Sequence, residues 1–400
     1  MINWILNITL NILRLKKRSP NLLVFGAWNG EKYADNSRYL FEYLKREYPL
    51  VRTVWITKND QVKEKLNSQG YECYIYNETN GIKARLNCGY VFFTNGINDV
   101  GRFDLTHGAI KVALWHGMPL KKMGYATNNL MKRNKNIFRA LQYLYLKIYN
   151  PSQRDVSIAT SIKTKELMCQ AFHAKPIDVH ITGQPRNDVL FSEGVKSKVN
   201  NELGHDEGKK FILYLPTWRD FGKEDLFLKE TTLALINDIS FMESLKLNGI
   251  FLYVKPHPRV ELNIKSNGNI RVVDDDFPYD TQELLSSSDM LITDYSSAFI
   301  DYALLKKPIF FYTPDLDEYK KTGNDLFLDF DRFSSSSISN VEDLKRTILS
   351  AEETVKGIDN SRLVNLIFND SSLVDGEYCK KVIEVMTDYY GLILKNDEII

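Results

Sequence analysis

Residues 289–312, DMLITDYSSAFIDYALLKKPIFFY, place two short apolar runs on either side of a helical one. The runs at 290–293 and 309–312 are almost wholly apolar, which is typical of strands buried on both faces of a sheet. Residues 298–305 between them carry apolar side chains at helical spacing. A strand, a helix and a second strand in this order predict a parallel βαβ unit.

The same alternation of short apolar runs and amphipathic helices extends in both directions from this stretch. Strands are predicted at 21–28, 51–57, 71–77, 90–95, 111–116 and 178–183, and again at 209–218, 250–258, 269–274, 290–295 and 308–313. Helices are predicted at 37–49, 60–70, 281–288 and 296–306, with one more between 218 and 250. The fold class is therefore α/β, with two Rossmann-like domains of parallel sheet.

A polar, charged segment at 192–210 separates the two series of strands and is the natural linker. We expect one domain over 20–195, a second over 208–375, and a C-terminal helix within 376–400 that crosses back to the first. Two such domains in one chain predict a ligand cleft between them, at the carboxyl ends of their strands.

The composition excludes some classes of protein. The chain has 400 residues, 44% of them hydrophobic and 26% charged, with a net charge of +1, which argues against a dedicated nucleic-acid binder. Its four cysteines are scattered and form no CxxC pair, so they are expected to be reduced thiols rather than disulfides or zinc ligands.

Two segments carry unusual basic charge. Residues 1–19 are apolar and then basic, and form either a helix in the membrane interface, with Lys16, Lys17 and Arg18 near anionic lipid, or a helix packed on the protein. Between Asp104 and Asp155 there is no acidic residue. The bases of this second segment are Lys111, Lys121, Lys122, Lys132, Arg133, Lys135, Arg139, Lys147 and Arg154. We expect 105–154 to face an anionic membrane or substrate, with a solvated face or a nucleic-acid contact as alternatives.

Candidate chemical groups follow predicted strands. His116 lies in WHGMPLKKMG (115–124), and from the residues alone it is either a catalyst or a buried ring. In VKPHPR (254–259), two prolines hold the chain extended around His257, with Lys255 and Arg259 as cations suited to an oxygen-rich anion.

The segment that follows the strand at 290–293 offers phosphate-binding groups. Ser296 and Ser297 stand where a helix begins, which suits either a phosphate or ordinary capping, and Asp294 and Asp301 could orient a ligand or cap. The aspartates at 274–276 could suggest a divalent metal, but we expect no metal site. Together these groups favour transfer chemistry on a diphosphate-linked nucleotide, with a histidine accepting the proton of an attacking hydroxyl.

Five motifs in order resemble the CDP-glycerol glycerophosphotransferase family, which comprises the teichoic-acid primases and polymerases and related capsule enzymes. They are WHGMPLKKMG, TGQPRNDVL, ILYLPTWRD, KPHP and the stretch 289–312, and the resemblance covers roughly residues 22–320. It implies a glycosyltransferase-B-type fold without a required metal or cofactor. The N-terminal domain would then serve the acceptor and the C-terminal domain the nucleotide donor.

The implied reaction moves glycerol phosphate from CDP-glycerol to a hydroxyl of a polyprenyl-diphosphate-linked glycan acceptor and releases CMP. The implied location is peripheral, at the cytoplasmic face of the cell membrane, on an anionic lipid surface and without nucleic acid; a homo-oligomer is left open. The alternatives are a transferase that uses CDP-ribitol or a nucleotide-sugar, and a non-catalytic membrane-bound assembly protein of the same fold.

By resemblance, His116 is the general base and His257 contacts the diphosphate, while Asp294, Ser296 and Ser297 lie at the donor phosphates. Further motif positions are Thr217, Arg219 and Arg259 on the donor side, and Pro185 and Arg186 on the acceptor side. Gly117 and Pro119 would hold His116, and Lys121 would begin the basic acceptor surface.

The chain departs from the family pattern in three places. The arginine–glycine and proline–glycine pairs that commonly follow the DLDEY region are missing after Tyr319, which puts donor contacts from that loop in doubt. Met118 stands where threonine is commoner, next to the proposed base. The lack of a long N-terminal extension favours a primase-like or capsule-type enzyme over the large polymerases.

Overall fold

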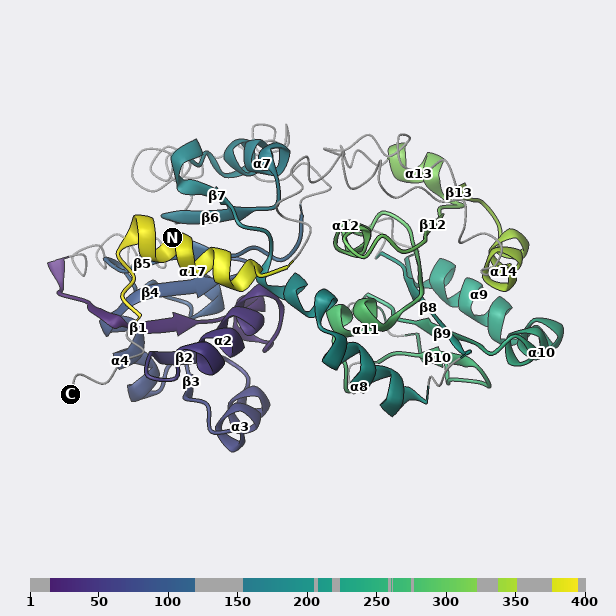
Figure 1. Cartoon of the computed structure of the whole chain (residues 1–400), viewed down its shortest axis with the longest axis horizontal. Helices are drawn as coiled ribbons and strands as arrows, with labels where there is room; N and C mark the ends of the chain where they lie inside the picture. The colour runs from purple at the N-terminus through teal and green to yellow at the C-terminus, as the bar shows by residue number, and fades with distance from the viewer. Residues whose placement is uncertain are drawn as a thin grey trace. The chain divides into compact units, whose positions relative to one another are not determined.

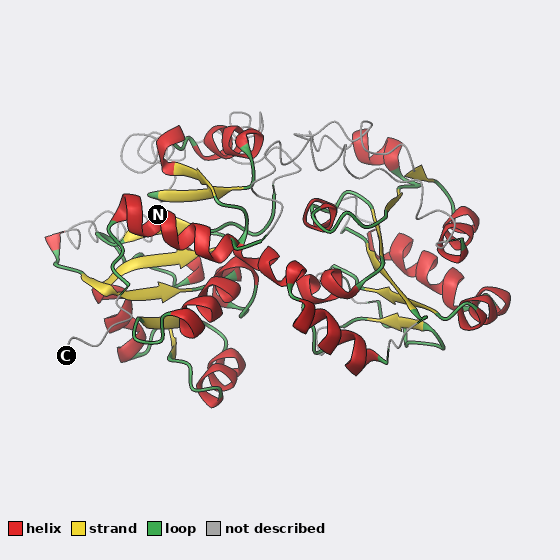
Figure 2. Ribbon diagram, in the orientation of Figure 1, coloured by secondary structure: helices red, strands yellow, loops and turns green. Residues whose placement is uncertain are grey.

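The computed structural model describes residues 15–118, 154–204, 208–217, 224–257, 260, 262–274, 277–321, 337–350 and 376–394. The chain forms two compact units (Figure 1). Unit 1 comprises 1–118, 123–188 and 375–400, and unit 2 comprises 119–122 and 189–374. In each unit, strands form a central layer with helices beside it (Figure 2).

Unit 1 is built on a seven-stranded sheet in the order β3-β2-β1-β4-β5-β6-β7, with every neighbouring pair parallel. Its strands are β1 (Ser19–Phe25), β2 (Arg52–Thr57), β3 (Cys73–Ile75), β4 (Cys88–Phe93), β5 (Ile110–Ala113), β6 (Val156–Ala159) and β7 (Val179–Ile181). The central strands are apolar on both faces because helices cover both faces.

Alternate side chains of these strands enter two separate cores. Leu23, Phe25 and Phe92 pack against helices α2 (Asp35–Glu47) and α17 (Tyr378–Tyr390) on one face. Val24 and Val91 pack on the other face, with α4 (Thr79–Asn87). The other helices among the described residues of this unit are α3 (Asp60–Ser68), α7 (Ile162–Phe172), and the short 3₁₀ helices η2 (Trp28–Gly30), η3 (Ile97–Asp99), η5 (Pro176–Asp178) and η6 (Pro185–Phe191), the last of which runs on into unit 2.

Unit 2 has a six-stranded parallel sheet in the order β10-β9-β8-β11-β12-β13. Its strands are β8 (Lys210–Leu215), β9 (Ile250–Val254), β10 (Ile270–Val272), β11 (Met290–Thr293), β12 (Ile309–Tyr312) and β13 (Ser337–Ile338). The helices that the structure describes in it are α8 (Glu193–Leu203), α9 (Glu224–Ile236), α10 (Ile239–Leu247), α11 (Thr281–Ser287), α12 (Ala298–Ala303), α13 (Leu316–Lys321) and α14 (Val341–Leu349). The predicted β11–α12–β12 unit is confirmed, with Leu291 beside Ile309 in parallel register.

The structure corrects three of our expectations about elements. The expected linker at 192–210 contains helix α8, which packs on α11 in unit 2. The one helix expected between 218 and 250 is two, α9 and α10. Strand β6, only four residues long, and strand β13, of two residues, were not predicted.

The structure also places three of the basic side chains that we expected at an anionic surface. Arg18 donates to main-chain carbonyls, including that of Arg85 at 3.0 Å, and Lys111 is buried in an ion pair with Asp104. The guanidinium carbon of Arg154 lies 3.7 Å from the centre of the Phe172 ring. These three cations are therefore held by the protein's own groups. The other bases of 105–154 lie outside the described residues.

Candidate active site

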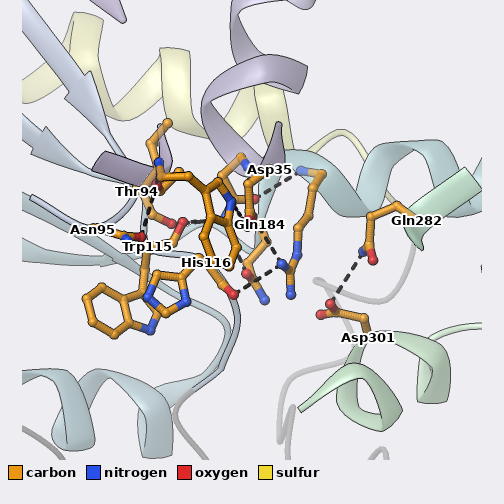
Figure 3. Close-up of polar contacts among 12 residues, drawn as sticks. Asp35, Thr94, Asn95, Trp115, His116, Gln184, Gln282 and Asp301 are labelled. Carbon is orange, nitrogen blue, oxygen red and sulfur yellow. Dashed lines mark hydrogen bonds and ion pairs between the residues drawn. The ribbon is translucent and has the colours of Figure 1, made fainter. Parts of the chain in front are cut away.

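Five neighbouring strands of unit 1 deliver loops to one edge of the sheet. Strands β1, β4, β5, β6 and β7 are consecutive in the sheet and parallel, so their carboxyl ends meet at the same edge. The loop after β5 carries His116, and the loops after β1, β4 and β7 carry Trp28, Thr94 and Arg186. Figure 3 labels His116 and Thr94 among the residues of this edge, together with Asp35, Asn95, Trp115 and Gln184.

The imidazole of His116 is half-buried and bounded by aromatic rings. The Trp115 ring is stacked on it, with 4.3 Å between the ring centroids, and the Trp28 ring lies 5.6 Å away. Burial lowers the pKa of His116, because the charged form is poorly solvated. Asp35 acts in the opposite direction and Arg186 adds to the lowering.

The main chain around His116 has conformations that few residues adopt. Trp115 has φ of 58°, a left-handed value that is costly for a bulky side chain, and Gly117 has φ of 130°, which glycine tolerates. The turn therefore depends on the contacts that hold it. Pro119, which we expected to support it, lies outside the described residues.

Met118 has a packing role in the structure. Its side chain is 4% exposed, and its sulfur accepts a hydrogen bond of 3.3 Å from the Thr160 hydroxyl at the end of β6. A thioether fills this buried position, so the departure from the commoner threonine is a matter of packing beside β6.

The TGQPRND motif (182–188) connects the His116 loop to the C-terminal helix. Arg186 donates to the His116 carbonyl oxygen at 3.1 Å, while both oxygens of Asp188 accept from main-chain N–H groups at the start of α17. Gly183 has φ of 74°, and a Cβ there would lie 2.1 Å from the Tyr378 ring. The motif therefore contacts both the His116 loop and the start of helix α17.

Three residues of the site have no role in our sequence-based account. Asn36 is fully buried, and its amide nitrogen donates to the carbonyls of Leu114 and Trp115 at 2.9 and 3.0 Å. Asp35 pairs with Arg186 at 3.0 Å. Asp99 accepts from the main chains of Asn29, Thr94 and Asn95. Their only signal in the sequence is polar residues directly after strands or at a helix start.

Unit 2 brings its expected site residues to one edge in the same way. His257, Thr217 and Asp294 follow β9, β8 and β11, which are neighbours in the sheet. Asp294 is buried, and both its oxygens accept from the Thr217 main-chain N–H, at 2.9 and 3.0 Å. This carboxylate therefore ties two loops together.

The serines of unit 2 differ in detail from the expected caps. Ser297 precedes α12 but makes no side-chain capping bond, while the Ser296 hydroxyl accepts from Ala298 N at 3.3 Å. Asp301, in α12, accepts from the Gln282 amide at 3.3 Å, and both are buried (Figure 3). Arg219 and Arg259 lie outside the described residues, as does Lys121.

No group of three or more histidine, cysteine or acidic side chains suited to a metal occurs in the described part of the chain, and Asp275 and Asp276 lie outside it. Among the helices that the structure describes, none has the length and apolar composition needed to cross a bilayer.

Comparison with known proteins gives consistent relatives. The chain is 25% identical over 401 residues to the teichoic acid poly(glycerol phosphate) polymerase of Bacillus spizizenii, covering 95% of each chain. It is 25% identical over 383 residues to the teichoic acid glycerol-phosphate transferase of Staphylococcus aureus, covering 93% of this chain and 94% of that one. With the teichoic acid poly(glycerol phosphate) polymerase of Staphylococcus epidermidis it shares 28% identity over 316 residues, which cover 76% of this chain and 41% of that one.

A solved structure of the wall teichoic acid polymerase TagF has the same fold. The TM-score is 0.72 at 21% identity, with 96% of this chain and 95% of that one covered. The predicted glycosyltransferase-B-type pair of Rossmann-like units is thereby confirmed at the level of the fold. We expected a chain of this length to be primase-like or capsule-type rather than a polymerase. A relative that the chain matches almost end to end is named a polymerase, so the length of the chain does not support that expectation.

The family model described as CDP-glycerol:poly(glycerophosphate) glycerophosphotransferase matches residues 8–386. That match covers nearly the whole chain, and the five motifs that suggested the family lie within it. The chain therefore belongs to the CDP-glycerol:poly(glycerophosphate) glycerophosphotransferase family.

Proposed function

We propose that the chain transfers glycerol phosphate from CDP-glycerol to a hydroxyl of a lipid-linked acceptor, in the synthesis of teichoic acid or a related cell-surface polymer. The observation that carries the proposal is the position of His116, half-buried against the Trp115 and Trp28 rings at the carboxyl edge of the unit 1 sheet, in a chain of this family. Relatives named as glycerol-phosphate polymerase and transferase match almost end to end.

In this proposal, His116 accepts the proton of the attacking hydroxyl. The hydroxyl oxygen forms a bond to the phosphorus that carries glycerol, and the bond from that phosphorus to the oxygen bridging to CMP breaks. CMP leaves with the electron pair. A lowered pKa keeps the imidazole neutral near pH 7, which is the form that can take a proton.

Unit 2 would hold the donor. We assign the diphosphate to His257 and to the backbone and hydroxyls of Ser296 and Ser297, at the ends of neighbouring strands. Arg219 and Arg259 match motif positions and would add positive charge. A carboxylate repels phosphate, so we assign Asp294 to shaping the two loops rather than to contacting the donor. Thr217 shares this role because its main-chain N–H donates to both Asp294 oxygens.

The acceptor side would involve Arg186, Gly117, Pro119 and Lys121. Arg186 and Gly117 shape the His116 loop, as their contacts and dihedral angles support. Pro119 and Lys121 keep the roles that resemblance implies.

The donor polyol is the point at which a second candidate has support. The chain is 30% identical over 235 residues to the teichoic acid ribitol-phosphate polymerase TarK of Staphylococcus aureus, which covers 57% of this chain and 43% of that one. Purified protein incubated with a lipid-like acceptor and CDP-glycerol, CDP-ribitol or a nucleotide-sugar separates the candidates by nucleotide release. We expect CMP release with CDP-glycerol; release with CDP-ribitol alone would favour the second candidate, and no turnover with any donor a non-catalytic protein.

The setting of the reaction is part of the proposal. A lipid-linked acceptor implies a peripheral position at the cytoplasmic face of the membrane. Residues 1–14 and the basic residues of 119–153 are the segments we assign to that contact. Arg18, Lys111 and Arg154 are left out of it because of their partners within the protein.

A further inference from the structure

The left-handed backbone of unit 1 is concentrated around His116. Of the eight non-glycine residues with positive φ in the described part of the chain, four belong to this site: Trp28, Asn29, Asp35 and Trp115, with φ between 50° and 65°. A left-handed backbone is strained for a bulky residue such as tryptophan, and it persists only where surrounding contacts hold it. The contacts that hold these four therefore carry information about what the site must position.

Asp35 lies at the centre of those contacts. One carboxylate oxygen accepts from the Arg186 guanidinium at 3.0 Å, and the other accepts from the Trp28 indole N–H at 3.2 Å. The same Arg186 nitrogen donates to the His116 carbonyl oxygen at 3.1 Å, and the Trp28 ring lies beside the imidazole. Asp35 thus reaches both the main chain and the ring side of His116, in each case through one other residue.

The pair is placed where its charge has an effect. The side chain of Asp35 is 5% exposed and that of Arg186 is 12% exposed, so water screens them weakly. The neighbouring Asn36 is fully buried, and its side-chain nitrogen donates to the main-chain carbonyls of Leu114 and Trp115. Its side-chain oxygen Oδ1 accepts from the main-chain N–H of Arg186 at 3.1 Å. The first turn of α2 therefore fixes the ends of two strands against each other.

We propose that Asp35 is a positioning residue for the reaction: its carboxylate fixes Arg186 and Trp28, and through them the orientation and electrostatic surroundings of His116. It does not touch substrate. The inference rests on the proposed function only in giving His116 the proton-accepting role.

The charged groups near His116 predict the direction in which its pKa should move in each variant. They are Asp35 on α2, Arg186 on η6 and Asp99 on η3. Asp35 favours the protonated imidazole, and Arg186 disfavours it. Removing Asp35's charge should therefore lower the pKa of His116, and removing Arg186's charge should raise it, with Asp99 as a constant background.

The experiment compares Asp35→Asn with Arg186→Gln by NMR titration of histidine-labelled protein, where the His116 signal is identified by its loss in His116→Gln. Asparagine tolerates the left-handed backbone of position 35, so the fold should be retained. We expect the pKa of His116 to move down in Asp35→Asn and up in Arg186→Gln. Glu47→Gln, the same change on the exposed end of α2, is the matched control and should move nothing.

Kinetics provide the second readout. Asp35→Asn should lower kcat roughly 10- to 100-fold with KM for CDP-glycerol within about twofold, because a small misplacement of a reacting group costs rate rather than ground-state binding. Shifts of the same sign in both variants, or wild-type kcat and titration in Asp35→Asn, would overturn the positioning role. Full activity in His116→Ala would instead overturn the proposed function, and the titrations would still report on Asp35.

Discussion

At the scale of the residue, burial is the largest influence on the pKa of His116. The loss of solvation lowers its pKa, and Asp35 offsets this in part. The surroundings of the imidazole therefore disfavour its protonated form, and the unprotonated form is the one that can accept a proton from a hydroxyl.

This environment predicts the pH dependence of the reaction. Since the base must be neutral, activity rises with pH through the pKa of His116, and that acidic limb should lie below the ordinary histidine value of 6.5. The measurement is kcat/KM for CDP-glycerol against pH. A limb centred above 6.5 would show that His116 is not the titrating base.

The same residue contributes to the pH dependence of stability. Because the folded pKa is below the unfolded one, the unfolded chain binds this proton more tightly. The contribution therefore destabilises the fold as pH falls through the unfolded value, and it is absent well above that value.

Single residues show where sequence reasoning ends. His116 and Arg186 were found because they sit in motifs at strand ends. Asp35 and Asn36 were missed because an aspartate and an asparagine before an apolar helix look like ordinary helix-start residues. Lys111 was counted as surface charge because its buried partner, Asp104, becomes visible only when the chain is folded.

At the scale of the element, the loop after β7 and helix α17 act as one structure. Asp188 accepts from the first N–H groups of α17, and the Tyr378 ring lies directly over Gly183. Arg186, between them in sequence, holds the His116 carbonyl. The C-terminal helix therefore supports the loop that carries the proposed base.

The Gly183→Ala substitution tests this connection. The left-handed backbone at φ 74° costs alanine about 1 kcal/mol, and the clash with Tyr378 adds roughly 1–3 kcal/mol. Gly391→Ala, at φ 67° with open space around it, is the matched control at the other end of α17 and should show the strain alone. Equal losses of unfolding free energy in denaturant titrations of the two variants would contradict the packing of Tyr378 on Gly183.

The helices and strands with the most apolar residues were the easiest to predict from the sequence. Eleven of the thirteen strands that the structure describes were predicted because a buried parallel strand is a continuous apolar run, as in IFFY at 309–312, whereas β13 has only two residues and gives no such run. Strand β6 was missed because VSIA is four residues long and contains a serine. Helix α8 has the polar composition of a linker, and Val199 is its one buried residue.

At the scale of the whole molecule, two α/β units each gather functional groups at the carboxyl edge of a parallel sheet. Both units were predictable from the alternation of apolar runs and amphipathic helices, and the family from the order of five motifs. The site edges followed from the rule for parallel strands. The distribution of charge was not predictable, because net charge along the sequence does not show which cations are paired in the fold.

The proposed membrane contact involves segments that are far apart in the sequence, and so concerns the whole molecule. Deleting residues 1–14, with Arg18 kept because it holds carbonyls of unit 1, and reversing the charge of Lys132, Arg133 and Lys135 should weaken binding to anionic liposomes. Sedimentation with anionic and neutral vesicles at low and high salt measures this. Binding that is insensitive to both salt and these changes would contradict an electrostatic membrane contact.

The most direct test of the central claim is product formation by a His116→Ala variant. Wild-type protein given CDP-glycerol and a lipid-linked acceptor should yield CMP and an acceptor extended by glycerol phosphate, detected together by chromatography and mass spectrometry. His116→Ala should lose both products, while His173→Asn, a histidine change at an exposed left-handed helix end that asparagine accepts, should keep them. Extended acceptor from His116→Ala at the wild-type rate would contradict the account.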